Sequence, residues 1–192
     1  MGWRALLLCV LAAALAVALP SAGGGASAGT ARAFVVGDSL AQGTAPYLPQ
    51  YLRGWRLQQR SSVGFHLADG VAAVRSRSDS LPPYLVVSLG TNDDPRFVSG
   101  FRAGVEAIVA TAGTDRCVVW PNIVRPPAVG TTYAEYNRVL RLEAASHRNL
   151  HIVDWAALLR AHPAWVRSDG VHASAAGYRA RAAAIAAALE HC

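Results

Sequence analysis

Lysine is absent from this chain of 192 residues, and all 18 of its basic residues are arginine. The arginines are scattered from Arg4 to Arg181 and form no basic run interleaved with aromatic residues. We therefore expect no nucleic-acid partner, because nucleic-acid-binding proteins concentrate positive charge on one surface. The formal net charge of +6 favours at most a weak attraction to anionic polymers.

Three kinds of motif are also missing. No histidine, cysteine and aspartate residues have the spacing of a metal site, so we expect no metal. No glycine-rich loop of the kind that binds phosphates is present, and we expect no cofactor. The G-x-S-x-G turn of the α/β-hydrolases is absent as well, which excludes that family at the level of its motif.

The only long hydrophobic run lies at the N-terminus. Residues 5–19 are nearly all apolar, follow Arg4 and end at Pro20. The run is short for a membrane span, and small residues follow it. It indicates a signal peptide over residues 1–28, cleaved after Ala28 or after Ala22, and a secreted or cell-envelope location. A retained membrane anchor is the alternative, so contact with a membrane is expected only through this segment.

Cysteine is scarce. Cys9 lies within the hydrophobic run, which leaves Cys117 and Cys192 for the exported chain. An even pair in an exported protein favours a disulfide. Two buried free thiols are the alternative.

Residues 29–192 are long enough for one domain with a sizeable core. Short apolar segments alternate with segments of helical spacing, and this alternation predicts a three-layer α/β/α fold with a five-stranded parallel sheet. The expected strands are residues 33–36, 55–60, 84–89, 116–120 and 150–153, the second of them an edge strand. The expected helices are residues 44–52, 67–75, 95–110, 131–147, 155–162 and 173–190.

Three helix starts carry local signals. Pro95 opens the third expected helix, because proline is favoured in a first turn. Thr131 or Thr132 caps the fourth, and Ser174 is one cap for the last.

Polar residues that can take part in catalysis follow the strands. Ser39 comes directly after the first strand and Asn92 after the third, while Asp169 and His172 share a later loop. Open α/β sheets bind their ligands beyond the carboxyl ends of the strands, so we expect these residues at one edge of the sheet. Ser39 read alone is also a common helix-capping residue, and Asp169 a common turn residue.

Three sequence blocks carry a resemblance to a known family. They are Gly37-Asp38-Ser39-Leu40, Gly90-Thr91-Asn92-Asp93 and Asp169-Gly170-Val171-His172. From residue 33 to the last helix the chain resembles the SGNH hydrolases, the GDSL esterase/lipase superfamily. This resemblance implies a flavodoxin-like fold with strand order 2-1-3-4-5. The family's second block is a single glycine, which we place at Gly64, with Gly70 as the alternative.

The resemblance also implies roles for these residues. Ser39 is the expected nucleophile, His172 the base that takes its proton, and Asp169 the carboxylate that orients the histidine ring. The backbone N–H groups of Ser39 and Gly64 and the side-chain amide of Asn92 form the expected oxyanion hole.

Two further pairs complete the predicted site and fold. Asp38 and Asp93 are expected to brace their loops by accepting backbone N–H bonds. In the implied topology the last helix ends at the sheet edge where the strands begin, close to Cys117 in the fourth strand. A Cys117–Cys192 bridge would therefore tie the C-terminus to the sheet.

The sequence thus predicts an exported, monomeric serine esterase that hydrolyses short acyl esters of a small molecule or a glycan. The alternatives are a transacylase or deacetylase that acts on envelope glycans through the same site, and a catalytically silent binding module.

Overall fold

The computed structural model describes Met1 and residues 30–192 of the chain. The predicted signal peptide, its cleavage sites and Cys9 lie outside the described residues and stay predictions. No helix among the described residues is both long enough and apolar enough to cross a bilayer.

Five parallel strands form the centre of the domain, in the order β2-β1-β3-β4-β5. This confirms the predicted fold class and strand order. The strands are β1 (Arg32–Gly37), β2 (Arg56–Ser61), β3 (Tyr84–Ser88), β4 (Cys117–Pro121) and β5 (Leu150–Val153). β1 and β3 are neighbours, and their last residues Gly37 and Ser88 pair with each other. The segments that follow these two strands therefore start side by side.

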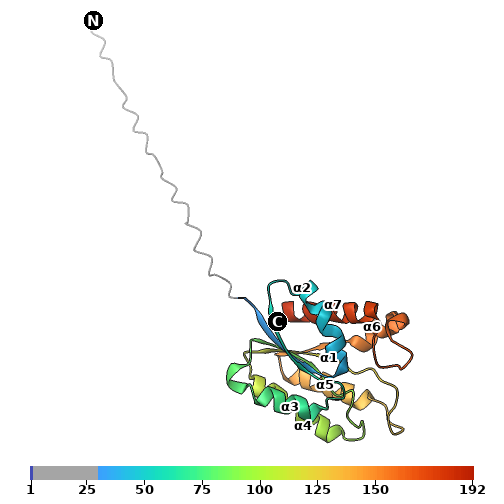
Figure 1. The fold of residues 1–192 in the computed structure, drawn as a ribbon. Helices are drawn as coiled ribbons and strands as arrows, with labels where there is room; N and C mark the ends of the chain where they lie inside the picture. The colour runs from blue at the N-terminus through green and yellow to red at the C-terminus, as the bar shows by residue number, and fades with distance from the viewer. Residues whose placement is uncertain (2–29) are drawn as a thin grey trace.

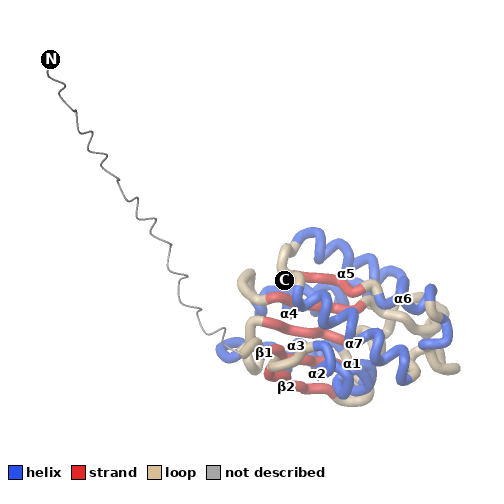
Figure 2. The backbone as a smooth tube through the Cα atoms, turned by 90° about the horizontal axis from the view of Figure 1, so that it is seen from above, coloured by secondary structure: helices blue, strands red, loops and turns tan. Residues whose placement is uncertain are grey.

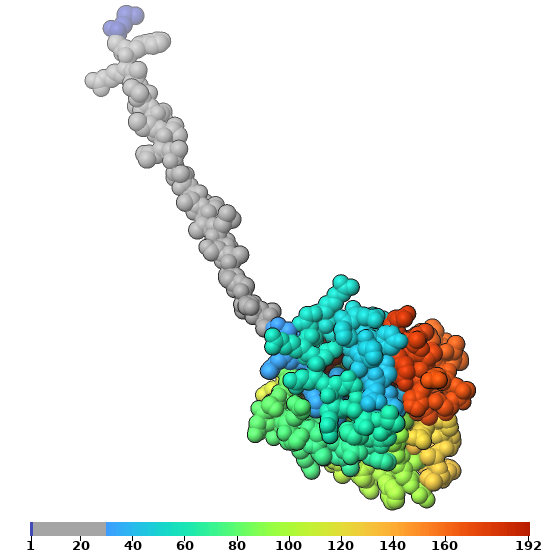
Figure 3. Space-filling model, in the orientation of Figure 1, coloured from blue at the N-terminus to red at the C-terminus, as the bar shows by residue number. Residues whose placement is uncertain are grey.

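Helices cover both faces of the sheet (Figure 1). One face carries α1 (Ser39–Thr44), α2 (Leu48–Tyr51) and α7 (Ala175–Glu190), which lie side by side on the surface seen in Figure 3. The opposite face carries α3 (Leu67–Arg75), α4 (Val98–Ala112) and α5 (Ala134–Ser146). The short helix α6 (Trp155–Ala161) follows β5, and Figure 2 shows it beyond the end of the sheet near α7.

The core is divided by the alternation of side chains along the strands. Phe34 and Val36 of β1 point into the cluster formed with α3, α4 and α5. Val35 points to the other side, where it packs with Leu48 and with Ile185 of α7. Both faces of the central strands are buried, as their continuous hydrophobic sequences predict. β2 is mostly exposed at the sheet edge, which confirms its predicted position.

The predicted helix boundaries need three corrections. The first helix begins at Ser39 and not at residue 44, because Asp38 is its N-cap and the Asp38 carboxylate accepts the N–H of Leu40. The helix predicted from Pro95 begins at Val98, because residues 94–97 form a turn in which Asp94 binds Arg96. α5 begins at Ala134 after Tyr133, without a threonine cap. Ser174 does cap α7, as predicted, by accepting the N–H of Gly177.

The two cysteines meet at the opposite edge of the sheet from the nucleophile. Cys117 begins β4, Cys192 follows α7, and their Cα atoms are 5.9 Å apart with the sulfurs in bonding contact. His151 offers a ring nitrogen close to the same two sulfurs, and these are the three side chains among the described residues that are grouped tightly enough to hold a metal ion. A disulfide would remove both thiolates from that group, because only thiolate sulfur is a strong metal ligand.

Candidate active site

The nucleophile turn, residues 37–40, joins β1 to α1. The backbone N–H of Asp38 donates to the carbonyl of Ser88 at 3.1 Å, which fixes the turn against the end of β3. A Cβ on Gly37 would lie 2.7 Å from the same carbonyl, so only glycine permits this close approach. The turn thereby places Ser39 at the start of α1, above the neighbouring ends of β1 and β3.

The histidine loop, residues 166–173, brings a base to this serine. Val166 and Ala173 pair at the base of the loop, which then projects Asp169 and His172. Ser39 Oγ lies 2.9 Å from His172 Nε2, and His172 Nδ1 lies 2.9 Å from Asp169 Oδ2. Three residues that are up to 133 positions apart in the chain therefore form one continuous hydrogen-bonded relay. This relay is the arrangement that serine nucleophiles require.

Asp169 is held by its own loop. Its Oδ1 accepts the backbone N–H groups of Val171 and His172, each at 2.9 Å. These bonds and the contact with the His172 ring hold the pKa of the Asp169 carboxyl well below its usual range, with the Val171 bond the largest cause. The carboxylate stays ionised and can accept a hydrogen bond from the N–H at Nδ1 of the ring. Nε2 then carries no proton and can take the proton of the serine hydroxyl.

Asp38 lies in the opposite environment. Its side chain is fully buried, and burial raises the pKa of its carboxyl despite the bond from Leu40 and the positive charge of Arg181. Arg181, in α7, is itself buried directly behind the nucleophile turn. Its guanidinium donates to Ser88 Oγ at 3.2 Å and to Thr44 Oγ1 at 3.4 Å. Burial lowers the pKa of Arg181 to about 10, so it remains charged at neutral pH.

The loops that carry the expected oxyanion donors are joined by hydrogen bonds, since the N–H of Ser62 donates to the carbonyl of Gly37 at 3.2 Å. Ser39 is the first residue of α1, and N–H groups in a first helical turn have no acceptor within the helix. Gly64 adopts φ +79°, a conformation that favours glycine, in the loop between β2 and α3. Asn92 Nδ2 donates to the carbonyl of Phe65, the next residue along that loop, at 3.0 Å. An amide nitrogen has a second hydrogen, which is available to a substrate oxygen.

Gly70, the alternative second-block glycine, is placed inside α3. A Cβ there would lie 2.0 Å from Leu89 Cδ1, so this glycine lets the helix pack closely on the sheet. A buried helical position offers no free N–H to a substrate. Gly64 is therefore the better match to the expected donor.

Asp93 connects the third block to α3. Its two carboxylate oxygens accept the N–H of Leu67 at 3.2 and 3.0 Å, and His66 Nδ1 lies 3.4 Å away. Burial raises the pKa of this carboxyl. The contact joins the loop that carries Asn92 to the start of α3, just after the loop that carries Gly64.

The sequence names Arg125 only as a loop arginine that could meet an anionic substrate group, and it does not predict the contact of Arg125 with Asn92. Arg125 lies in the loop after β4, where a solvated side chain is expected, yet it is only partly exposed. Its Nη1 donates to the carbonyl of Thr91 and lies 3.4 Å from Asn92 Oδ1. By engaging the amide oxygen, Arg125 turns the amide nitrogen of Asn92 away from itself and toward Phe65.

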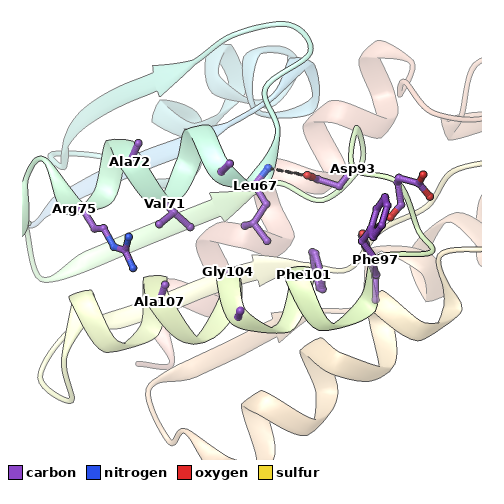
Figure 4. Close-up of a pocket in the computed structure, with 14 residues that line it drawn as sticks. Leu67, Val71, Ala72, Arg75, Asp93, Phe97, Phe101, Gly104 and Ala107 are labelled. Atoms are coloured by element: carbon purple, nitrogen blue, oxygen red, sulfur yellow. Dashed lines mark hydrogen bonds between the residues drawn. The ribbon is translucent and has the colours of Figure 1, made fainter.

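The α3–α4 cavity is a large and mostly apolar hollow beside this site (Figure 4). It has a volume of about 540 Å³ and begins at Leu67 and Asp93, whose bond is drawn there. From that end it continues between the two helices to Arg75 and Ala107. Its lining contains neither Ser39 nor His172, so its volume alone assigns it no role in the chemistry.

Comparison with known proteins decides the family. The GDSL-like lipase/acylhydrolase family matches residues 35–180, which include the nucleophile turn and the histidine loop. The chain belongs to this family. Its members are hydrolases that act on ester bonds, which confirms both the resemblance and the predicted class of enzyme. No curated protein matches the chain by sequence.

Solved structures of low sequence identity share the fold. The catalytic domain of peptidoglycan O-acetyltransferase A from Streptococcus pneumoniae is 21% identical with a TM-score of 0.70, over 84% of this chain and 94% of that domain. A lipolytic protein of the G-D-S-L family from Veillonella parvula is 16% identical with a TM-score of 0.65, over 81% and 95% of the two chains. The esterase EstA from Pseudoalteromonas sp. is 14% identical with a TM-score of 0.62, over 83% and 97%.

Proposed function

We propose that this protein is an exported serine esterase that cleaves short acyl esters through an acyl-enzyme on Ser39. The observation that carries the proposal is the continuous relay from Ser39 Oγ through the His172 ring to Asp169, with 2.9 Å at each step. His172 takes the serine proton as the hydroxyl attacks the ester carbonyl, and then returns it to the leaving alcohol. Water, deprotonated by His172, then attacks the acyl-enzyme and releases the acid, and the proton returns to Ser39.

The oxyanion of each tetrahedral intermediate is bound by the N–H groups of Ser39 and Gly64 and by Asn92 Nδ2. The α1 start, the positive φ of Gly64 and the hydrogen bonds of Asn92 support preorganisation of these donors. Preorganised donors stabilise developing charge without a cost of reorganisation. Asp38 and Asp93 brace the two loops that carry Ser39 and Asn92.

The experiment compares residues 29–192 with the variant Ser39→Ala in the hydrolysis of p-nitrophenyl acetate and butyrate. We expect turnover that the substitution reduces by several orders of magnitude, and a covalent Ser39 adduct with a sulfonyl fluoride in the wild type alone. His172→Ala serves as the second variant. Equal activity in the wild type and Ser39→Ala would refute the nucleophile assignment, provided that circular dichroism shows both proteins folded.

A transacylase is the second candidate. The site is open, with the Asp169 side chain 49% and the His172 side chain 37% exposed, so a large acceptor alcohol can approach the acyl-enzyme. The fold likeness to a protein named a peptidoglycan O-acetyltransferase adds support. Product analysis with and without a glycan acceptor separates the two. Acylated glycan at the expense of free acid indicates transfer, and unchanged release of acid indicates hydrolysis.

We also propose that Cys117 and Cys192 form a disulfide in the exported protein. The Cα separation of 5.9 Å is within the range that a disulfide spans. A bridge that closes a loop of this size contributes about 4 kcal/mol in the chain-entropy model. Mass spectrometry of secreted protein, alkylated before reduction, should show no modified cysteine. Two alkylated thiols would contradict the proposal.

A further inference from the structure

A second hollow, which we call the cationic cleft, borders the histidine loop. It has a volume of about 420 Å³, and its walls come from the loop after β4, the start of α5, α6 and the histidine loop itself. Both charged residues in its lining are arginines, Arg125 and Arg160, and no acidic residue lies among the described residues that line it. The other lining residues are apolar or neutral and polar, among them Ile123, Leu159, Val166, Thr132, Tyr133 and Asn137.

Neither Ser39 nor His172 lines this cleft, but two of its lining residues, Gly170 and Arg125, connect it to the catalytic groups. Gly170, between Asp169 and His172, lines it, and a Cβ at Gly170 would lie 2.7 Å from Pro126 Cγ, so the histidine loop rests on the loop after β4. Arg125 also lines the cleft, while its Nη1 binds the Thr91–Asn92 segment. A molecule in the cleft would therefore contact the loop that carries His172 and the arginine that binds Asn92.

The two arginines of the cleft are not paired directly with a carboxylate within residues 30–192. Asp154 is the acidic residue that interacts electrostatically with Arg160, without forming an ion pair, and its Oδ1 accepts Asn122 Nδ2 at 2.8 Å and the N–H of Ala157 at 2.9 Å. Arg125 and Arg160, the latter in an exposed position, therefore contribute two guanidinium groups without an ion pair to the lining of the cleft. Guanidinium binds planar or tetrahedral oxyanions well.

The position of the cleft indicates which half of the ester it contacts. His172 must reach the leaving oxygen to protonate it, so the alcohol portion of the substrate lies on the side of the histidine loop. We propose that the cationic cleft binds an oxyanion group, a carboxylate or a phosphate, carried by the alcohol portion of the ester. This inference rests on the proposed function and names the class of alcohol that it prefers.

Matched substrates isolate the charge. 4-Acetoxybenzoate and its methyl ester carry the same acetyl group on the same ring and differ in one negative charge, while 4-acetoxyphenyl phosphate carries the alternative oxyanion. Each kcat/KM is divided by the rate of hydroxide-catalysed hydrolysis, which removes differences in intrinsic reactivity. The variants are Arg160→Gln and Arg160→Glu. The matched control is Arg148→Gln, which removes the same charge from an exposed position before β5, at the far edge of the sheet.

We expect the wild type to prefer the charged esters, and Arg160→Gln to reduce that preference about fivefold, as for loss of a partly exposed charge pair. Arg160→Glu should reduce it further, added salt should weaken it, and Arg148→Gln should leave it unchanged. A reduction for only one oxyanion identifies the source of the group. Equal preferences in Arg160→Gln and Arg148→Gln would overturn the proposal.

A binding measurement keeps this test separate from the proposed function. If no ester is hydrolysed faster by the wild type than by Ser39→Ala, the proposed function fails, and the cleft is tested without turnover. NMR titration of Ser39→Ala with 4-hydroxybenzoate and with methyl 4-hydroxybenzoate should then show tighter binding of the charged product. The added substitution Arg160→Gln should remove that difference, and equal binding of the two compounds to Ser39→Ala would refute the cleft.

Discussion

The nucleophile turn and the histidine loop each hold a side chain of the site in place, but the turn does so in a buried environment and the loop in an exposed one. Each places one reactive side chain next to an aspartate, Asp38 beside Ser39 and Asp169 near His172. Asp38 is fully buried, with one hydrogen bond from Leu40 and the buried charge of Arg181 behind it. Asp169 lies in an exposed loop and accepts two backbone N–H groups as well as the histidine ring.

The difference in surroundings gives the two carboxyl groups opposite pKa shifts. Burial raises the pKa of Asp38, whereas hydrogen bonds from Val171 and His172 lower that of Asp169. The interior thus positions the proposed nucleophile through packing, and the loop positions the proposed base through local hydrogen bonds. Apart from Ser39 itself, substitutions of the groups that support the turn should consequently affect stability most, and substitutions in the loop should affect rate most.

The largest effect is expected for Asp169→Asn. The asparagine oxygen can still accept the N–H groups of Val171 and His172, but its NH₂ group then faces the ring and favours the tautomer with the proton on Nε2. That tautomer cannot take the serine proton, and the loss in kcat should be on the order of 10⁴-fold. Steady-state kinetics measure the loss, and a thermal melt should show a midpoint close to that of the wild type. A large fall in the melting temperature would break the comparison, because the loop would then be supporting the fold.

Asn92→Ala tests a residue that belongs to neither the nucleophile turn nor the histidine loop. Removal of one oxyanion donor should lower kcat by about 10²- to 10³-fold. The control is Asn149→Ala, which removes an amide that donates to the carbonyls of Gly113 and Arg116 at the other edge of the sheet. That variant should lose about 1–2 kcal/mol of stability and retain its kcat. Equal kcat in the two variants would remove Asn92 from the oxyanion hole.

Arg181→Met tests the buried side of the comparison. The substitution keeps much of the side-chain volume but removes a buried cation that donates to Ser88 and Thr44 and stabilises the buried Asp38 carboxylate electrostatically. Loss of one charge from such a buried polar group typically costs about 3 kcal/mol. For a domain of this size the melting temperature should fall by about 6–12 °C. Arg179→Met, on the exposed side of α7, is the matched control and should change little. Unchanged stability in Arg181→Met would mean that the interior does not hold the nucleophile turn through this charge.

The fold was predictable because its signals are local. The hydrophobic runs of β1, β3 and β5 lie where alternation of strand and helix places them, and the three sequence blocks fall at the strand ends. The helix starts were less predictable, since Pro95 satisfies a first-turn preference while the Asp94–Arg96 contact delays the helix to Val98. Local preference and local contact compete there, and only the folded chain shows which prevails.

The supporting arginines were not predictable. Arg181 lies in an alanine-rich helix where small residues hide which face is buried, and its partners Thr44 and Ser88 are 137 and 93 positions away. Arg125 reaches Asn92 from 33 positions away, in a loop whose composition indicates exposure. Contacts of this kind arise from the strand order, and neither periodicity nor a short motif records them.

The smallest expected effect is a difference in pH dependence between the two aspartates. An unfolded chain titrates both near pH 3.9. Asp38 has a raised pKa when folded, so its ionised form costs stability at neutral pH, and the cost disappears as the pH falls through the folded pKa. Asp169 has a lowered pKa when folded, so its contribution is present above pH 3.9 and is lost as the pH falls toward the folded pKa.

Urea unfolding from pH 7 to pH 3.5 separates these signs when the wild type is compared with Asp38→Asn and with Asp169→Asn. The stability of the wild type relative to Asp38→Asn should increase on acidification, because only the wild type has a buried carboxylate that becomes protonated and uncharged. The stability of the wild type relative to Asp169→Asn should decrease over the acid end of the same range. If acidification changed the relative stability with the same sign in both pairs, burial and loop hydrogen bonding would not act oppositely on the two carboxyl groups. The proposed electrostatic difference between the turn and the loop would then be wrong.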